Sequence, residues 1–532
     1  MKFPALTILI ALAAVDLCSA ATINIQANGT GDYPTIQAGI LAASAGDEIL
    51  LGDGVYVGGG NRDISFLGKA ITVRSASGDA SACIIDCQGS ESDRHRGFRF
   101  ISGEGNDSRL EQITIRNGWE FTGGGILCDG SSPFIVGCTI ELCHAEYPAN
   151  DEGLGGGVCN LDGNPQLDNC NILSNVSDKE GGGIYSTGGV ISVTSCAIQG
   201  NAAGESGGGI RVVDCSGLPH HRSRIDGCLI AGNNGGIEGG GVWADGSIIF
   251  IQSCTIKGNW AMNGGGLFLQ GGQISESNGP TVRYCVIARN QALNGGGIAA
   301  VTINGQILFC TIVGNEASGS GGGILYFYDT DDGGAISNTI IAFSAAGDAV
   351  HCWAPNTIMD IDCCDVYGNA GGDYVDCITM QQAQNGNLEL DPQFCDYGND
   401  DFTLMDTSPC LAPNNSCAAQ IGALGLGCTL VAAPDDGASP HLDRLEQNQP
   451  NPFNPSTVIA FSLERETWAS LAVFDARGRQ VRLIHAGELP AGRHRLSWDG
   501  RDERGHRVPS GVYFYRLQTP TWNSAKRMLL LS

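Results

Sequence analysis

The sequence predicts an all-β protein, a right-handed parallel β-helix (solenoid) followed by a small β-sandwich, on three observations. A Gly-Gly-Gly-aliphatic motif recurs with its first glycine at Gly123, Gly155, Gly181, Gly207, Gly239, Gly264, Gly295 and Gly321. A Cys-x-Ile-x-x-Asn motif keeps nearly the same spacing, with its cysteine at Cys170, Cys196, Cys228, Cys254, Cys285 and Cys310. After Val431 both repeats stop, and short alternating segments without cysteine follow.

The first twenty residues have the composition of a secretory signal peptide. Lys2 precedes an apolar run, 6–15, and small residues follow that run. We therefore expect residues 1–20 to be removed on export. We expect no transmembrane segment, because no run approaches the roughly 20 apolar residues that a membrane helix needs. A lipid anchor on Cys18 is the alternative, which the preceding Leu17 disfavours.

The charge of the chain is strongly negative and unevenly placed. The 532 residues include 29 Lys and Arg against 56 Asp and Glu. From His441 onward the count is 13 against 9, which leaves 16 against 47, or −31, on everything before. Such an acidic body repels a phosphate backbone, so nucleic acid is excluded as its partner.

The repeats have the periodicity of short strands. Ile251 stands three positions before Cys254, and Ile256 follows two positions after it. The two-residue step from Cys254 to Ile256 is the period of a strand, and the three-residue step from Ile251 to Cys254 shifts this period where the chain must bend. Helical repeats are excluded because each Gly costs up to about 1 kcal/mol inside a helix. Coils of this length can stack at about 4.8 Å, so that each column becomes an in-register ladder. We expect the Asn column to hydrogen-bond from coil to coil and to tolerate a left-handed turn.

The cysteines fall into two groups. Ladder cysteines one coil apart should lie near the strand spacing of about 4.8 Å, beyond the roughly 3.8 Å between β-carbons that a disulfide prefers. We interpret them as small buried side chains. The last stretch predicts an end cap closed by disulfides of undetermined pairing, from Cys352, Cys363, Cys364, Cys377, Cys395, Cys410, Cys417 and Cys428. A zinc site is the alternative, but paired CxxC spacing is missing.

The body, residues 21–430, opens with a predicted short amphipathic helix, 33–43, and predicted strands at 48–51 and 70–73. Here Thr35-Ile36-Gln37 and Gly54-Val55-Tyr56 resemble the common opening of the pectin-lyase-like right-handed β-helix superfamily. The Gly-Gly-Gly-Ile and Ile-x-x-Asn pairs are similar to the GGAI and FxxN repeats of chlamydial polymorphic outer-membrane adhesins, with Ile where that family has Phe. The resemblance implies the fold and says little about activity.

Catalytic signatures of that superfamily are not intact here. A resemblance to pectate lyases would imply a catalytic Arg beside Asp-bound calcium. A resemblance to polygalacturonases would imply motifs such as Gly-Asp-Asp and Gly-His-Gly. Two coils instead carry an extra loop, because the distance from glycine to cysteine is 21 after Gly207 and Gly264 but 15 in the other five coils. Both loops leave the same corner two coils, or about 10 Å, apart.

These loops supply the candidate binding residues, since long loops on a rigid scaffold often carry function. The candidates are His220, His221, Arg222, Arg224, Glu276 and Asn278. A third group, Asp329, Asp331 and Asp332, is a candidate calcium site, because Ca²⁺ takes six or more oxygen ligands. Solvated loop charge is the alternative interpretation of all nine residues.

Residues 431–446 are predicted to be a linker, and residues 447–532 a sandwich of short strands at 457–463, 469–474, 494–498 and 512–517. This segment resembles the C-terminal sorting domain of type IX secretion cargo and the related Ig-like domain of flagellar hook-capping proteins. The matching stretches are 448–457, 475–479, Trp498-Asp499-Gly500, Ser510-Gly511-Val512-Tyr513 and 526–530. The resemblance implies an Ig-like sandwich, a bacterium with an outer membrane, and export through secretion machinery that recognises residues 447–532. A plain Ig-like spacer is the alternative.

Two classes of function remain. The first is a secreted or cell-surface protein that binds a polysaccharide or cell-surface glycan, or adheres, without catalysis. The second is a polysaccharide lyase or glycoside hydrolase with a divergent site. The missing catalytic set favours the first, although fold alone never settles function.

Overall fold

The computed structural model describes residues 20–147, 153–213, 222–245, 249–271, 279–301, 305–327, 335–354, 359–429, 444–448, 451, 453, 457–475, 477–502 and 506–530. The chain divides into two compact units, Met1–Leu430 and Val431–Ser532. The predicted signal peptide up to residue 19 and the linker residues 431–443 lie outside the described residues.

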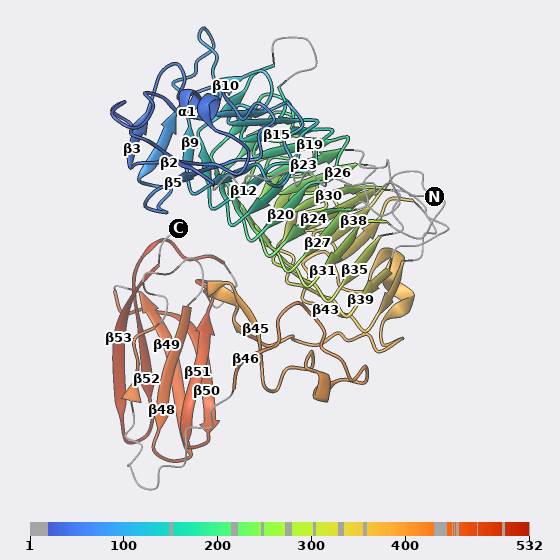
Figure 1. Cartoon of the computed structure of the whole chain (residues 1–532). Coiled ribbons are helices and arrows are strands. Elements are labelled where there is room, and N and C mark those ends of the chain that lie inside the picture. The colour runs from blue at the N-terminus through green and yellow to red at the C-terminus, as the bar shows by residue number, and fades with distance from the viewer. Residues whose placement is uncertain are drawn as a thin grey trace, which may run out of the picture. The chain divides into compact units, whose positions relative to one another are not determined.

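The first unit winds into three long sheets of parallel strands, stacked coil upon coil (Figure 1). Among the described residues these sheets hold 13, 12 and 11 strands, and we name them sheets A, B and C. Sheet A contains β1 (Thr22–Ile25), β2 (Glu48–Leu51), β5 (Thr72–Ser75), β8 (Arg109–Glu111), β12 (Phe134–Val136), β16 (Gln166–Asp168), β20 (Ser192–Thr194), β24 (Ser223–Asp226), β27 (Ile249–Gln252), β31 (Thr281–Arg283), β35 (Gln306–Leu308), β39 (Ala335–Ser337) and β42 (Asp360–Asp362).

Sheet B contains β3 (Gly54–Tyr56), β6 (Cys83–Asp86), β9 (Thr114–Arg116), β13 (Thr139–Glu141), β17 (Asn171–Leu173), β21 (Ala197–Gln199), β25 (Leu229–Ala231), β28 (Thr255–Lys257), β32 (Val286–Ala288), β36 (Thr311–Val313), β40 (Ile340–Ala342) and β43 (Asp365–Tyr367). Sheet C contains β4 (Ile64–Ser65), β7 (Phe98–Phe100), β11 (Ile126–Asp129), β15 (Val158–Leu161), β19 (Ile184–Thr187), β23 (Ile210–Val213), β26 (Val242–Asp245), β30 (Leu267–Gln270), β34 (Ile298–Val301), β38 (Ile324–Tyr326) and β41 (Val350–Cys352). Two short parallel strips lie between sheets B and C along the chain: β10 (Trp119–Glu120), β14 (His144–Ala145), β18 (Val176–Ser177) and β22 (Ala202–Ala203), then β29 (Trp260–Asn263), β33 (Gln291–Asn294) and β37 (Glu316–Ala317).

The predicted ladders form the core of the solenoid. Ile230, Ile256 and Ile287 are Cα partners in successive strands of sheet B, and each is fully buried. Like residues therefore stack on like residues, and their burial is the main favourable term in folding. The predicted parallel β-helix is confirmed by this register.

The Asn column hydrogen-bonds from coil to coil, as predicted. The Asn175 amide nitrogen Nδ2 donates to Oδ1 of Asn201 at 3.0 Å and to the Ile140 carbonyl at 2.9 Å. The left-handed turn falls one residue earlier than expected, at Ser174, whose φ is 53°. The Asn side chain is thereby free to point inward.

The glycine triplets fulfil two requirements of the coil. Gly181, the first of its triplet, has a φ of +67°, a conformation that side chains with a Cβ rarely adopt. Gly182, the second, is needed for close approach: a Cβ there would lie 2.4 Å from the Ala202 carbonyl oxygen of the next coil.

The N-terminal end of the solenoid is closed by the predicted helix, α1 (Ile36–Ala42). The Thr35 hydroxyl caps it by accepting a hydrogen bond from the Ala38 N–H at 3.2 Å. The helix buries Ile36 and Ile40 in the solenoid core.

The C-terminal end is closed by an irregular cap that packs on the outer face of sheet B. It contains η1 (Asp376–Gln381), β44 (Phe394–Asp396), η2 (Tyr397–Asn399), β45 (Asp401–Met405), η3 (Ala412–Asn414) and β46 (Leu426–Cys428). Phe394 and Phe402 join a buried cluster with Ile340. Asp400 pairs with Lys257 at 3.2 Å and with Arg289 at 2.5 Å, which ties the cap to coils far back in the sequence.

The disulfide prediction is correct for six of the eight cap cysteines. The bonds are Cys352–Cys377, Cys363–Cys417 and Cys395–Cys428, and disulfides are typical of oxidising compartments. Cys364 and Cys410 are free and buried, so their inclusion was wrong. Cys364 continues the ladder, because its Sγ donates to the Ile336 carbonyl at 3.4 Å just as Cys310 does to the Val282 carbonyl at 3.5 Å.

The second unit is an antiparallel β-sandwich. One sheet contains β47 (Arg444–Leu445), β48 (Thr457–Leu463) and β51 (Gly492–Trp498), and the other contains β50 (Gln480–Leu489), β49 (Thr467–Asp475), β52 (Gly511–Gln518) and β53 (Asn523–Leu530). Phe461, Trp498 and Tyr515 are among its buried side chains. All four predicted strands form. The long strands β50 and β53 were not predicted, and none of the β50 side chains is fully buried.

Candidate functional site

The corner between sheets C and A carries the predicted loops. Both long loops join a strand of sheet C to the next strand of sheet A: β23 to β24 around the first, and β30 to β31 around the second. In sheet A, β24 pairs with β27 and β27 pairs with β31, so the two loops start two coils apart, as predicted. The connection from β38 to β39, which contains the three aspartates, leaves the same corner two coils further on.

Most candidate residues lie outside the described residues. They are His220, His221, Glu276, Asn278, Asp329, Asp331 and Asp332. Arg222 and Arg224 are described, and both lie at the start of sheet A's strand β24 or just before it.

An arginine–phenylalanine cluster lies beside this corner on the outer face of sheet A. Phe250 in β27 points outward between two buried neighbours, because the strand alternates. The Arg222 guanidinium lies 4.9 Å from the centre of the Phe250 ring, and that of Arg283 lies 5.8 Å from it. Both distances are within the range of cation–π attraction.

Polar partners hold the cluster in place. Arg283 donates from Nε and from a terminal nitrogen to Oε1 of Gln252, at 3.0 and 2.7 Å. Arg224 pairs with Asp226 at 2.6 Å. Partial burial raises the pKa of Asp226, but hydrogen bonds from Arg224 and Gln252 and the charge of Arg283 outweigh it and hold that pKa below its ordinary value.

The cluster places positive charge on an acidic body. Three arginines lie within three successive coils of a body whose acidic residues outnumber basic ones by 47 to 16. A flat aromatic ring with guanidinium donors beside it can stack on a sugar ring and hydrogen-bond hydroxyl or carboxylate groups. We name Arg222, Arg224, Phe250 and Arg283 the arginine cluster.

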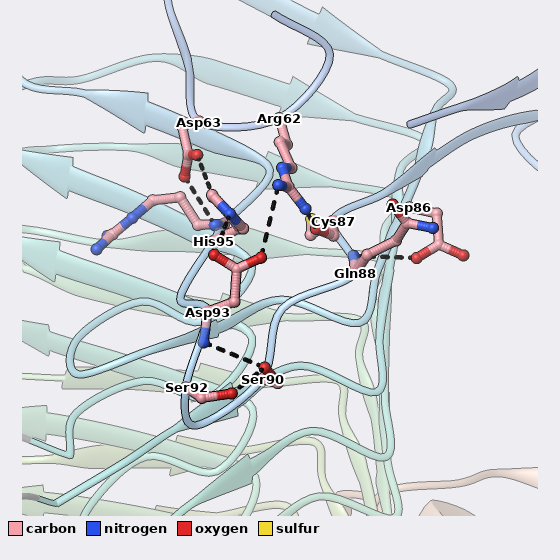
Figure 2. Close-up of polar contacts among 10 residues, drawn as sticks. Arg62, Asp63, Asp86, Cys87, Gln88, Ser90, Ser92, Asp93 and His95 are labelled. Carbon is pink, nitrogen blue, oxygen red and sulfur yellow. Dashed lines mark hydrogen bonds and ion pairs between the residues drawn. The ribbon is translucent and has the colours of Figure 1, made fainter. Parts of the chain in front are cut away.

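A second polar cluster, which the sequence analysis missed, lies near the N-terminal end (Figure 2). The His95 ring lies between two carboxylates, with Nδ1 2.6 Å from Asp63 and Nε2 3.1 Å from Asp93. Carboxylates only accept, so both contacts are hydrogen bonds when the ring carries both protons. Arg62 lies 3.8 Å from Asp93 and donates to the Cys87 carbonyl at 2.9 Å.

The segment that carries His95 is held to the solenoid on its other side. Arg94 pairs with Glu146 at 2.6 Å, and the Trp119 indole N–H donates to the same carboxylate at 3.0 Å. These hydrogen bonds, that from Trp119 foremost, hold the pKa of Glu146 below its ordinary value although burial opposes them. The signal that sequence could have offered is spacing: Asp63 and His95 are 32 residues apart, the length of one long coil.

The body and the module each match a known family. Residues 155–344 match the family model of a right-handed β-helix region. The body of this chain is a right-handed β-helix. Residues 453–521 match the FlgD Ig-like domain, which agrees with the antiparallel sandwich observed there.

Solved structures offer only distant likenesses to this β-helix protein. Dimeric latent PorU from Porphyromonas gingivalis is 20% identical over 18% of this chain and 10% of its own, with a TM-score of 0.16. PorZ, a surface component of the type-IX secretion system of the same organism, is 23% identical over 18% and 13%, with a TM-score of 0.14. The Dettilon tailspike protein is 12% identical over 92% and 80%, with a TM-score of 0.34. This chain spans only about a tenth of the length of the first two, and no curated protein matches it.

Among the described residues of the β-helix and its C-terminal module, no group of three or more His, Cys, Asp or Glu is arranged to hold a metal ion. Within the same ranges, no helix is long and apolar enough to cross a membrane.

Proposed function

We propose that this protein is exported to the outer surface of a bacterium with an outer membrane, where its β-helix binds a polysaccharide or cell-surface glycan without catalysis. The observation that carries the proposal is the arginine cluster, because Phe250 and its two neighbouring guanidinium groups face outward beside the corner where the loops leave. The three disulfides fit a protein that functions outside the reducing cytosol.

The chemistry of the cluster suits a sugar. The Phe250 ring offers an apolar surface, and the Arg222 and Arg283 guanidinium groups over this ring offer hydrogen-bond donors. The candidate loop residues His220, His221, Glu276 and Asn278 would extend the same surface, because their loops leave this corner. The aspartates Asp329, Asp331 and Asp332 would add a calcium-dependent contact two coils further on.

Export is proposed for the C-terminal module, residues 447–532. The module lacks cysteine and is basic, with 13 Lys and Arg against 9 Asp and Glu from His441 onward, in contrast to the acidic body. A unit so unlike its neighbour in composition fits a separate sorting signal that outer-membrane secretion machinery recognises.

The glycan proposal is tested on an array of acidic and neutral polysaccharides. Phe250→Ala and Arg283→Ala should each weaken retention about tenfold, the loss of roughly 1.4 kcal/mol. Phe134→Ala is the matched control, because the Arg109 guanidinium lies 4.4 Å from the Phe134 ring on the same face of sheet A. Equal loss in the control, or unchanged retention in both variants, would contradict the site.

A loop variant tests the candidate residues of the two long loops, of which the structure describes Arg222. Shortening residues 216–222 and 273–278 to the spacing of the other coils should leave the melting temperature unchanged and abolish retention. Retention that also falls with a calcium chelator, and is restored by added calcium, would support the aspartate site.

An enzyme is the second candidate, favoured by His95 and its two carboxylates (Figure 2). An imidazole oriented by a carboxylate is a common proton-transfer group. The same array is therefore scored for new unsaturated or reducing ends. Products lost with His95→Gln would assign a polysaccharide lyase or glycoside hydrolase site to the N-terminal end, and products lost with Arg222→Ala or Arg224→Ala would assign it to the loop corner.

A further inference from the structure

One face of the C-terminal module carries apolar side chains in contiguous rows, of which Val512 and Phe514 are exposed and Phe474 and Leu529 are half-buried. On the sheet that contains β49, β52 and β53, Phe474 and Phe514 are direct cross-strand partners. Val512 lies opposite Leu529 in the next pair of strands. Phe514 and Val512 are each 39% exposed, whereas Tyr513 and Tyr515 beside them point into the core.

Arginines flank these rows on the same face. The Arg516 guanidinium lies 4.7 Å from the centre of the Phe474 ring. Arg527 is the cross-strand partner of Phe514, and both arginines are exposed. Two cations therefore bracket the aromatic pair.

A hollow of about 280 Å³ continues the surface at the start of β52. Asp475, Arg477, Arg479 and the residues 510–513 line it. The one carboxylate of the hollow, that of Asp475, is paired with Arg479 at 3.1 Å. The two arginines outnumber this carboxylate, so the hollow as a whole offers hydrogen-bond donors to a ligand. Val512 belongs to both the apolar rows and the hollow, which makes them one continuous surface.

We propose that this surface, which we name the Phe514 face, is where the module docks an acidic protein segment of the export machinery. The inference deepens the proposed export function and rests on it. Soluble proteins seldom leave contiguous apolar side chains exposed unless they bind a partner, and aromatic residues and Arg are enriched at such interfaces. Apolar side chains of the partner would cover the Phe474–Phe514 pair while its carboxylates meet Arg516, Arg527 and the hollow.

A second copy of the chain is a poorer occupant. A two-fold pairing of this face would place the same arginine-bearing surface against itself, and like charges brought together oppose association. An acidic partner removes that repulsion, which is why charge complementarity selects it.

The functional test uses the full chain in its native host. Phe514→Glu should lower the amount of protein labelled on intact cells about tenfold and raise the periplasmic amount, with an unchanged melting temperature. Arg516→Glu should act in the same direction. Val458→Glu is the control, because Val458 is also 39% exposed but lies on β48 of the opposite sheet. Normal surface display of Phe514→Glu, or an equal defect in the control, would overturn the proposal.

A photo-reactive phenylalanine analogue at position 514 identifies the occupant. We expect a cross-link in living cells to a peptide rich in Asp and Glu from another protein. A cross-link to a second copy, to this chain's own β-helix or to lipid would refute the assigned partner, as would no cross-link. Deleting residues 447–532 distinguishes failure of the proposed export function from failure of the docking proposal alone. Export without the module contradicts the proposed function, whereas loss of export in the deletion but not in Phe514→Glu contradicts only the docking face.

Discussion

Asn201 accepts two hydrogen bonds from Asn175, the residue one coil earlier: one from the backbone N–H at 2.9 Å and one from the side-chain amide at 3.0 Å. Both residues are almost fully buried. The same pair of hydrogen bonds recurs between Asn201 and Asn233 in the following coil. Each Asn side chain therefore accepts the hydrogen bonds donated by the Asn of the preceding coil. The hydrogen bonds of the column reinforce one another along the solenoid.

Replacing Asn201 with Leu should lower the free energy of unfolding by about 3 kcal/mol or more. The Asn175 backbone N–H and the Ile172 carbonyl both lose their partner, and each buried unpaired group costs roughly 1–3 kcal/mol. Urea denaturation followed by circular dichroism measures the change. Asn171→Ala is the control: Asn171 is exposed, and its stability change should stay within about 0.5 kcal/mol.

The aliphatic ladder should be equally sensitive to charge. Ile256→Asp places a carboxylate at a fully buried position between Ile230 and Ile287, which should cost several kcal/mol. Thr255→Asp, one residue earlier, points outward and should be tolerated. Thermal melting compares the two, and a core variant that melts like the parent would refute the register.

Asp365 should make the C-terminal cap less stable as the pH rises. Burial raises the pKa of this carboxyl from 3.8 to about 6, although the Leu390 N–H and the Cys410 thiol donate to it at 3.1 Å each. The folded state thus holds a proton that the unfolded state releases. The stabilising contribution is complete below pH 3.8 and is lost as the pH rises through about 6, in total about 3 kcal/mol.

Asp365→Asn should abolish this dependence, since an amide stays neutral. The variant should be more stable than the parent at pH 8 and nearly equal to it at pH 3.5, by denaturant unfolding at both values. Asp362, at the end of β42, is exposed and provides the control. The stability of Asp362→Asn should depend on pH in the same way as that of the parent. The same pH dependence in parent and Asp365→Asn would show that Asp365 stays charged.

The repeated features could be predicted because each occurs many times. Cys254, Ile256 and Asn259 have equivalents in neighbouring coils, so their columns and burial follow from spacing alone. The capping helix followed from its short amphipathic pattern. Cys364 was misassigned because it was grouped with the other cysteines of the last stretch, whereas in the coil Cys363 occupies the corner and Cys364 points inward.

Features that occur once were not predicted. Phe250 lies in an outward column whose other members vary from coil to coil, so nothing in the sequence placed it beside Arg222 and Arg283. The His95 pair with Asp63 depends on one coil length near the irregular N-terminal end, before the regular repeat begins. Single contacts of this kind appear only when the coils are stacked in register.

Deleting residues 447–532 should leave a folded β-helix that is not displayed on the cell surface. The body has its own continuous hydrophobic core and its own caps, and the module has a separate core, so each should fold independently. The predicted signal peptide would still carry the truncated chain across the inner membrane, and it should accumulate in the periplasm with the melting temperature of the body. Surface labelling of intact cells and periplasmic fractionation make the comparison, with the full chain as reference. Truncated protein outside the cell in wild-type amount would eliminate the sorting role and leave an Ig-like spacer as the function of the module.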